Sequence, residues 1–235
     1  MSNSGKIYGI GVGPGDSDLL TVRAVRVLEK VDMVFAASST KNEYSHSLEI
    51  ASEFVRDDCE VVRLGYPMTR DQDILNDAWK ENCRIACEML QGGKSAAFLT
   101  LGDPLIYSTF GYMMQTMKCL CPEVEFEVVP GITSYQAAAA RSQQVLVESG
   151  QNLLLTSGVA DPEKFAETLE MVDNAVILKA YRNFPELRET VNEMGTKDVK
   201  FYTRLGLDGE AIYLDISEVP EKTNYLSLML LTAKK

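Results

Sequence analysis

Short apolar runs alternate with longer amphipathic stretches along the whole chain. The runs show little polar alternation, which is typical of strands covered on both faces, and the stretches between them repeat at helical spacing. Alternating strands and helices predict an α/β protein. The expected strands are 7–12, 32–37, 60–64, 96–101, 125–129, 152–156, 175–181, 200–204 and 226–233, with a further strand within 210–219. The expected helices are seven: one from 16–18 to about 30, and then approximately 46–55, 71–91, 107–120, 132–142, 162–171 and 185–194.

Capping residues set the ends of some of these helices. Asp16, Ser17 and Asp18 are expected N-caps of the first helix, and Gly92-Gly93 is expected to end the long third helix. The core face of the first helix would consist of Leu20, Ala24, Val27, Leu28 and Val31. A chain of 235 residues forms one large domain or two small ones, and a boundary near Pro130 predicts domains 1–129 and 130–235.

Composition narrows the class of protein. Hydrophobic residues make up 46% and charged residues 24%, and the net charge is −11. An acidic chain is a poor partner for a phosphate backbone, so we expect no nucleic-acid partner. No apolar run approaches a membrane span, and residues 1–6 lack the apolar stretch of a signal peptide, so we expect a cytoplasmic protein without a membrane partner.

Cysteine and histidine usage predicts no metal site. The five cysteines show no zinc-ribbon spacing, and we expect them to be reduced thiols that pack as small apolar residues. The single histidine is His46, so a multi-histidine metal site is not expected.

Two glycine-proline loops follow apolar strands, at 9–16 and at 101–109. Loops of this kind at strand ends predict a ligand crevice at the carboxyl edge of an α/β sheet. The first loop fails the GxGxxG dinucleotide pattern, because Pro14 or Asp16 stands where glycine is needed. Gly93-Lys94-Ser95 fails the phosphate-loop pattern, because Glu88 replaces its first glycine.

Together the motifs resemble the tetrapyrrole methylases. The resemblance rests on GxGPGD at 11–16 with Leu19-Leu20-Thr21, on GDPxxYST at 102–109, and on Val-Pro-Gly-Ile-Thr-Ser at 129–134. Within this family the chain looks most like the branch of precorrin-2 and cobalt-factor II C20-methyltransferases, since Leu101 replaces the first glycine of the usual GGDP form and Gln136–Arg141 is typical of that branch.

The resemblance implies an S-adenosylmethionine-dependent methyltransferase of cobalamin and porphyrin biosynthesis that acts on C20. It also implies a homodimer whose subunits have two α/β domains of the tetrapyrrole methylase fold, with the active site in the trough between them. The alternatives are a methylase acting on C11 or C17 of the corrin ring, and a carrier that binds tetrapyrrole or cofactor without turnover. Ala37 stands where uroporphyrinogen methyltransferases have a proposed aspartate base, which disfavours that substrate.

Site residues follow from the resemblance and from position. Carried over by motif, the cofactor-binding residues would be Pro14, Leu101, Gly102, Asp103, Ile106, Thr133, Ser134, Ala180, Tyr181, Leu205 and Leu228. The substrate carries several carboxylates, and the residues expected to bind it are Lys41, Arg70, Tyr107, Arg141, Lys179 and Arg182, whose cations lie in or near loops and strand ends. No catalytic base is identified, although Tyr107, Tyr135 and His46 are weak candidates for accepting the proton from C20.

Overall fold

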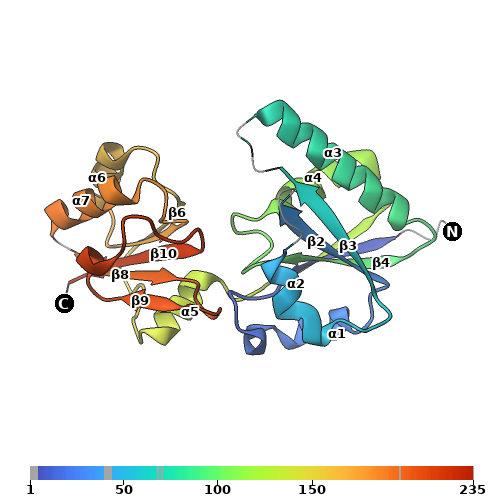
Figure 1. Cartoon of the computed structure of the whole chain (residues 1–235), viewed down its shortest axis with the longest axis horizontal. Coiled ribbons are helices and arrows are strands. Elements are labelled where there is room, and N and C mark those ends of the chain that lie inside the picture. The colour runs from blue at the N-terminus through green and yellow to red at the C-terminus, as the bar shows by residue number, and fades with distance from the viewer. Residues whose placement is uncertain (1–4, 40–43, 68, 70, 196, 235) are drawn as a thin grey trace. The chain divides into compact units, whose positions relative to one another are not determined.

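The structure is a computed structural model and describes residues 5–39, 44–67, 69, 71–195 and 197–234. The chain forms two compact units, Met1–Thr133 and Ser134–Lys235, and each unit has one five-stranded sheet with helices on both faces (Figure 1). The α/β prediction is therefore confirmed. The prediction that the chain has two domains, 1–129 and 130–235, stays a prediction.

The sheet of the first unit is parallel throughout. Its strands are β1 (Lys6–Gly11), β2 (Met33–Ser39), β3 (Glu60–Tyr66), β4 (Ser95–Thr100) and β5 (Glu125–Val129). They lie in the order β3-β2-β4-β1-β5. All five strands therefore end at the same edge, and β1, β4 and β5 end there as neighbours.

Helices cover both faces of this sheet. They are α1 (Val22–Leu28), α2 (His46–Ala51), α3 (Gln72–Met89) and α4 (Thr109–Leu120), with short 3-10 turns η1 (Ser17–Leu19) and η2 (Ser52–Phe54). Helices α3 and α4 lie on one face, and α1 and α2 lie on the other (Figure 1). Phe35 of β2, Phe98 of β4 and Phe110 of α4 are fully buried in the core cluster of this unit, where apolar area removed from water stabilises the fold.

The first helix begins later than expected. Asp16 caps only the 3-10 turn η1, and Thr21 is the N-cap of α1, where its hydroxyl accepts a hydrogen bond from Ala24 N at 3.1 Å. The expected core face is confirmed, since all five of its residues are buried: Leu20, Ala24, Val27, Leu28 and Val31.

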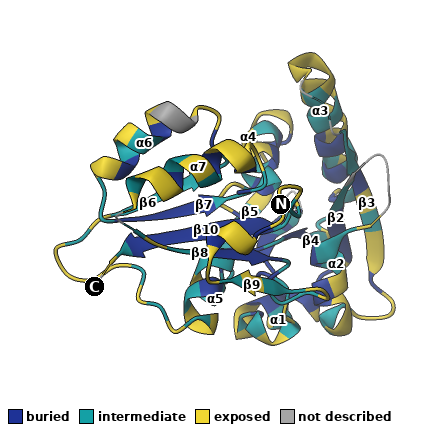
Figure 2. Ribbon diagram, turned by 60° about the vertical axis from the view of Figure 1, so that its left-hand side comes forward, coloured by how far each residue is buried: buried dark blue, intermediate teal, exposed yellow. Residues whose placement is uncertain are grey.

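The second unit has a mixed sheet in the order β6-β7-β10-β8-β9. Its strands are β6 (Leu153–Ser157), β7 (Asn174–Leu178), β8 (Lys197–Thr203), β9 (Ala211–Tyr213) and β10 (Ser227–Ala233), and its helices are α5 (Ser134–Arg141), α6 (Pro162–Glu170), α7 (Phe184–Met194) and the 3-10 turn η3 (Ile216–Glu218). Strand β6 pairs in parallel with β7, and the other pairs are antiparallel. Strands β7 and β10 are mostly buried, β8 is buried over its last three residues, and α6 and α7 expose their outer faces (Figure 2). Strands β7 and β8 end at the edge where β10 begins.

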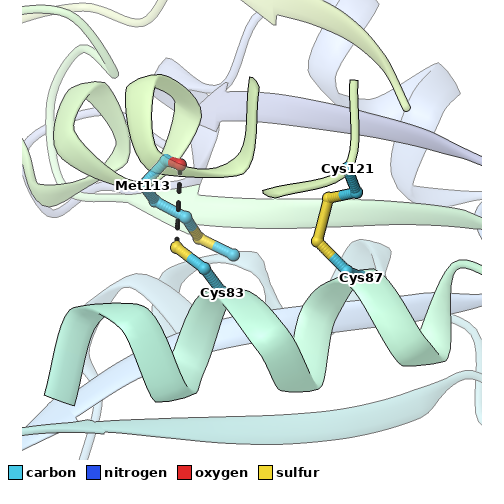
Figure 3. The surroundings of a disulfide bond; sticks show 4 residues. All are labelled: Cys83, Cys87, Met113 and Cys121. Carbon is cyan, nitrogen blue, oxygen red and sulfur yellow. Dashed lines mark hydrogen bonds between the residues drawn. A yellow bond between two sulfur atoms is a disulfide. The ribbon is translucent and has the colours of Figure 1, made fainter. Parts of the chain in front are cut away.

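The expectation of reduced cysteines is wrong for Cys87 and Cys121, which form a disulfide (Figure 3). Cys87 lies near the end of α3 and Cys121 directly follows α4, so the bond joins the two helices that cover one face of the sheet. Cys83, one turn before Cys87, is a buried free thiol whose sulfur donates to Met113 O at 3.7 Å. None of the described helices combines the length and apolarity needed to cross a membrane.

Candidate functional site

Three loops meet at the carboxyl edge of the first sheet. Residues 12–16 follow β1, residues 101–108 follow β4, and residues 130–133 follow β5. Because β4, β1 and β5 are neighbours in a parallel sheet, these loops are side by side. This is the edge at which the two glycine-proline motifs predicted a ligand site.

Backbone hydrogen bonds join the first two loops. Gly102 N donates to Gly13 O at 2.7 Å, and the two residues form an isolated antiparallel bridge. Gly13 and Gly102 have φ of +81° and +72°, which is the left-handed region that side chains avoid. Space beside Gly102 is open, since a Cβ built there would meet only Thr133 Cα, at 3.9 Å.

The end of β1 and the third loop touch through glycines. A Cβ on Gly11 would lie 2.6 Å from Gly131 N, and a Cβ on Gly131 would lie 2.7 Å from Gly11 Cα. Atoms cannot approach so closely without a shift of the backbone, so this contact admits only glycine. The result is an edge built from backbone rather than from side chains.

Asp103 fixes the second loop against the third. Its Oδ1 accepts from Leu105 N at 2.8 Å, and its Oδ2 accepts from Gly131 N at 3.2 Å. Hydrogen bonds to a charged acceptor are stronger than neutral ones. Asp103 therefore holds residues 101–105 in place beside the glycine contact.

The outer part of the second loop is apolar and exposed. Leu105 and Tyr107 expose about half of their surface (54% and 53%), and Ile106 exposes 36%. Tyr107 has φ of +48°, so it is not helical; the helix expected from 107 begins instead at Thr109, with Ser108 as its N-cap. Exposed apolar side chains beside a backbone-lined edge are suited to contact the flat face of an organic ligand.

Residues 6–220 match the family model described as Tetrapyrrole (Corrin/Porphyrin) Methylases. The chain belongs to this family. It is 31% identical over 217 residues to a cobalt-precorrin-2 C(20)-methyltransferase of Salmonella typhimurium, covering 92% of this chain and 90% of the relative. It is 32% identical over 229 residues to a probable cobalt-precorrin-2 C(20)-methyltransferase of Methanocaldococcus jannaschii, covering 96% and 95%.

The fold of this tetrapyrrole methylase has solved counterparts. One is the uroporphyrin-III C-methyl transferase from Thermus thermophilus complexed with S-adenyl homocysteine, with a TM-score of 0.69 and 22% identity. That similarity covers 97% of this chain and 92% of the other. The expected tetrapyrrole methylase fold is thereby confirmed.

The structure brings six of the expected cofactor residues to the loop edge of the first unit: Pro14, Leu101, Gly102, Asp103, Ile106 and Thr133. Pro14, Gly102 and Thr133 are buried, while Ile106 is exposed. Ser134, which follows Thr133, is the first residue of α5 in the second unit. Their contact with a cofactor stays a prediction.

The remaining cofactor residues lie in the second unit, near the edge where β7 and β8 end. Ala180 and Tyr181 follow β7, Leu205 follows β8, and Leu228 is the second residue of β10. Leu205 and Leu228 are buried in an apolar cluster that includes Ala138 of α5. Ala180 is also fully buried, and its N–H donates to Ser227 O at 3.3 Å.

The expected cations divide into three groups. Lys41 and Arg70 lie outside the described residues. Arg141 ends α5 and forms an ion pair with Glu210 at 3.2 Å. Lys179 and Arg182 lie in the loop after β7, where Lys179 is half-buried and Arg182 is exposed. Burial, followed by the charge of Arg182, lowers the pKa of the Lys179 amine.

The weak base candidates are scattered. His46 begins α2, and its ring packs edge-on against the ring of Tyr44, with 4.7 Å between the ring centres. The Nδ1 atom of His46 lies 3.8 Å from Oε2 of Glu49. Tyr107 lies on the exposed loop before α4, and Tyr135 packs beside the apolar cluster of α5. Ala37, at the position of the missing aspartate, packs against the core beneath α3.

Sequence reasoning missed two features. The contact of Gly11 with Gly131 joins residues far apart in the chain, and its only signal is the presence of glycine in both motifs. Tyr225, whose ring lies 5.3 Å from that of Tyr181, belongs to no motif and precedes β10 in a turn.

Proposed function

We propose that this tetrapyrrole methylase transfers a methyl group from S-adenosylmethionine to C20 of precorrin-2 or of its cobalt-containing counterpart, cobalt-factor II, in cobalamin biosynthesis. The observation that carries the proposal is the match to two relatives that bear the C(20)-methyltransferase name, at 31% and 32% identity over at least nine tenths of both chains. Because both relatives are named for a cobalt substrate, we expect the cobalt form to be preferred.

The backbone-lined edge of the first unit fits a cofactor. The open space beside Gly102 and the exposed atoms of the three loops offer polar groups with no side chain in the way. Pro14, Leu101, Gly102, Asp103, Ile106, Thr133 and Ser134 would hold the cofactor from this side, and Ala180, Tyr181, Leu205 and Leu228 from the second unit. When bound, S-adenosylmethionine supplies an activated methyl group.

The protein's own task is alignment. Methyl transfer is an in-line displacement, so the chain must hold the nucleophilic carbon, the methyl carbon and the sulfur in one line and keep water out. Asp103 holds the second loop rigid through two backbone hydrogen bonds, and the apolar residues Leu105, Ile106 and Tyr107 are suited to the ring of the substrate.

Cations would hold the carboxylate arms of the substrate. The proposed set is Lys41, Arg70, Arg141, Lys179 and Arg182, with Tyr107 against the ring. Arg141 is the weakest member, because Glu210 already neutralises part of its charge. C20 must also lose a proton after methylation, and Tyr107, Tyr135 and His46 stay the candidates for accepting it.

The test is anaerobic incubation with S-adenosylmethionine and either precorrin-2 or cobalt-factor II, followed by mass spectrometry. The expected result is the gain of one methyl group, located at C20 by NMR, with the cobalt form converted faster. A product methylated at C11 or C17 would assign another ring position. Tight binding of tetrapyrrole and cofactor without any methylation would replace the enzyme by a carrier.

A homodimer and a cytoplasmic location complete the proposal. Light scattering of the purified chain should give the mass of two subunits, and a monomer at micromolar concentration would contradict the dimer. The location has a chemical test, because the cytosol keeps most thiols reduced while the structure contains a disulfide. Alkylation of cells before lysis, followed by mass spectrometry, shows whether Cys87 and Cys121 are thiols or a disulfide in the cell. Alkylated thiols would support the cytoplasmic location, and an intact disulfide would count against it.

A further inference from the structure

Basic and aromatic residues gather at one edge of the second sheet, where β7 ends and β10 begins. Lys179 directly follows β7, with Tyr181 and Arg182 next in the loop, and Tyr225 precedes β10. Ala180 N donates to Ser227 O at 3.3 Å, so the two segments lie against each other. We call Lys179, Tyr181, Arg182 and Tyr225 the β7-edge cluster.

The cluster is held by specific contacts. Arg182 Nε donates to Tyr181 Oη at 3.2 Å, and its guanidinium lies 5.8 Å from the centre of that ring. The ring of Tyr181 packs at 5.3 Å against the ring of Tyr225. Gly158 leaves room for the arginine stem, since a Cβ there would lie 3.2 Å from Arg182 Cδ. The arginine is therefore positioned on an aromatic support, although its head is exposed.

The positive charges of the cluster are unmatched. Among the described residues, no carboxylate lies within 4 Å of Lys179 or Arg182, although the chain carries 34 acidic and 23 basic residues. Lys179 is half-buried, and burial with the neighbouring charge of Arg182 lowers the pKa of its amine. Two adjacent cations, one partly removed from water, cost free energy that a bound anion would offset.

Neutral donors surround these cations. Tyr181 Oη accepts from Arg182, so its own O–H is left to donate. Tyr225 exposes 49% of its surface, yet desolvation around its hydroxyl raises the pKa, which keeps the group a donor. Lys179 also has φ of +53°, an unfavourable conformation for a residue with a side chain, and such conformations cluster at ligand sites.

We propose that Lys179, Tyr181, Arg182 and Tyr225 form a binding site for a single carboxylate group. The site rests on the proposed function for its ligand, because both the tetrapyrrole and the amino-acid end of the cofactor carry carboxylates. An amine, a guanidinium and two phenol hydroxyls are all hydrogen-bond donors, and two of them are cations, which suits a small anion better than an uncharged flat ring. Tyr225 thereby becomes a binding residue that no sequence motif marks.

The test measures the affinity of the full chain for two probes, uroporphyrin III and S-adenosylhomocysteine, by isothermal titration calorimetry. Arg182→Gln removes an exposed charge and Tyr225→Phe removes one hydroxyl, so both variants should fold, which thermal unfolding checks. We expect Arg182→Gln to weaken one probe by about tenfold and Tyr225→Phe by about threefold, the losses typical of a charged and a neutral hydrogen bond. The matched control is Lys222→Gln, an exposed lysine of the same unit, with a change below about twofold.

Each outcome decides the proposal. A loss for uroporphyrin III alone assigns a carboxylate arm of the tetrapyrrole, and a loss for S-adenosylhomocysteine alone assigns the carboxylate of the cofactor. Unchanged affinity for both probes in both variants overturns the site, as does a wild-type chain that binds neither probe. Methyl transfer by the wild-type chain is assayed separately. If no methyl is transferred but Arg182→Gln still weakens binding of a probe, the proposed function is wrong and the carboxylate site is supported.

Discussion

Gly11 and Gly131 show how single residues without side chains can set the geometry of a site. Their backbones touch because neither has a Cβ, and this contact brings the loop after β5 against the end of β1. Asp103 then fixes the loop after β4 to the same turn. The positions of the three loops thus depend on contacts that a single added Cβ or a single lost carboxylate would break.

Gly131→Ala tests this contact. The new Cβ would lie 2.7 Å from backbone atoms of Gly11, so the loops must separate. We expect the free energy of unfolding to fall by about 2 kcal/mol, as for overpacked positions, and cofactor affinity to fall with it. Urea unfolding and calorimetry with S-adenosylhomocysteine measure the two effects.

The matched control is Gly111→Ala in the first turn of α4. A Cβ there would meet no described atom within 4 Å, and alanine favours helix over glycine by about 1 kcal/mol, so this variant should be more stable than the wild type. Equal effects at the two glycines would show that the contact between loops is not what Gly131 provides.

Asp32 gives the first unit a predictable pH dependence. Its Oδ2 accepts from Ser95 N at 2.7 Å and from Ser95 Oγ at 2.8 Å, and these bonds lower the pKa of the carboxyl. A lowered folded pKa stabilises the protein above the unfolded pKa, and the contribution is lost as pH falls through the folded value. Asp32→Asn should therefore destabilise the chain at neutral pH, by less than about 1 kcal/mol because the carboxyl is exposed to solvent.

The difference between wild type and Asp32→Asn should close as pH falls through the lowered pKa of Asp32, because both forms then carry a neutral side chain. Unfolding free energies across this range provide the measurement. Asp77→Asn, at an exposed position of α3, serves as the control and should show no such pH-dependent difference. A constant gap between Asp32→Asn and wild type at every pH would assign the effect to packing rather than charge.

At the scale of elements, apolar patterning predicted strands better than helix ends. The strand expected at 125–129 agrees with β5 residue for residue, because polar and apolar positions alternate at its start and Pro130 follows its last residue. Helix starts depend on one local choice, and Thr21 rather than Asp16 caps α1. Tyr107 looked helical from its neighbours, but its left-handed conformation postpones α4 by two residues.

The site was predictable only where a motif marked it. Both glycine-proline loops lie at the expected edge, because loops after parallel strands must share it. Tyr225 and the disulfide partners were not predictable, since their neighbours are distant in sequence and carry no local signal. Cys87 and Cys121 are 34 residues apart and meet only because α3 packs on α4.

The Cys87–Cys121 disulfide should stabilise the helical layer it joins. Closing a loop of this length restricts the unfolded chain, which is worth about 3 to 4 kcal/mol in the chain-entropy account. We expect Cys87→Ser to lower the free energy of unfolding by that amount, measured by urea denaturation without reductant.

Cys119→Ser is the matched control, because Cys119 is exposed and unbonded two residues from Cys121. It should leave the transition in place. If dithiothreitol does not move the urea midpoint of the wild type, and Cys87→Ser unfolds at the same midpoint as the wild type, the bond does not form in solution.

At the scale of the whole molecule, the two units contain different kinds of sheet, and the unfolding of the first unit can be followed separately through a single tryptophan. The only tryptophan, Trp79, lies on α3 and stacks on Tyr112 of α4 at 4.9 Å. Tryptophan fluorescence therefore reports unfolding of the first unit, whereas circular dichroism reports helices of both units.

Reduction of the disulfide should separate these two signals. We expect dithiothreitol to move the fluorescence midpoint to lower urea by about 2 M, while part of the circular dichroism transition stays in place. Coincident transitions with and without reductant would show that the chain unfolds as one cooperative body.

The position of β1 has a consequence during synthesis on the ribosome. In the described part of the chain, β1 pairs with β4 and β5, which both come later in the sequence, so β1 has no partner strand until residues 95–129 are made. At ordinary translation speeds this wait lasts roughly 4 to 24 seconds. Throughout it, the apolar residues Ile7 and Ile10 lack their partner strands, so we expect this segment of the nascent chain to be a substrate for ribosome-associated chaperones.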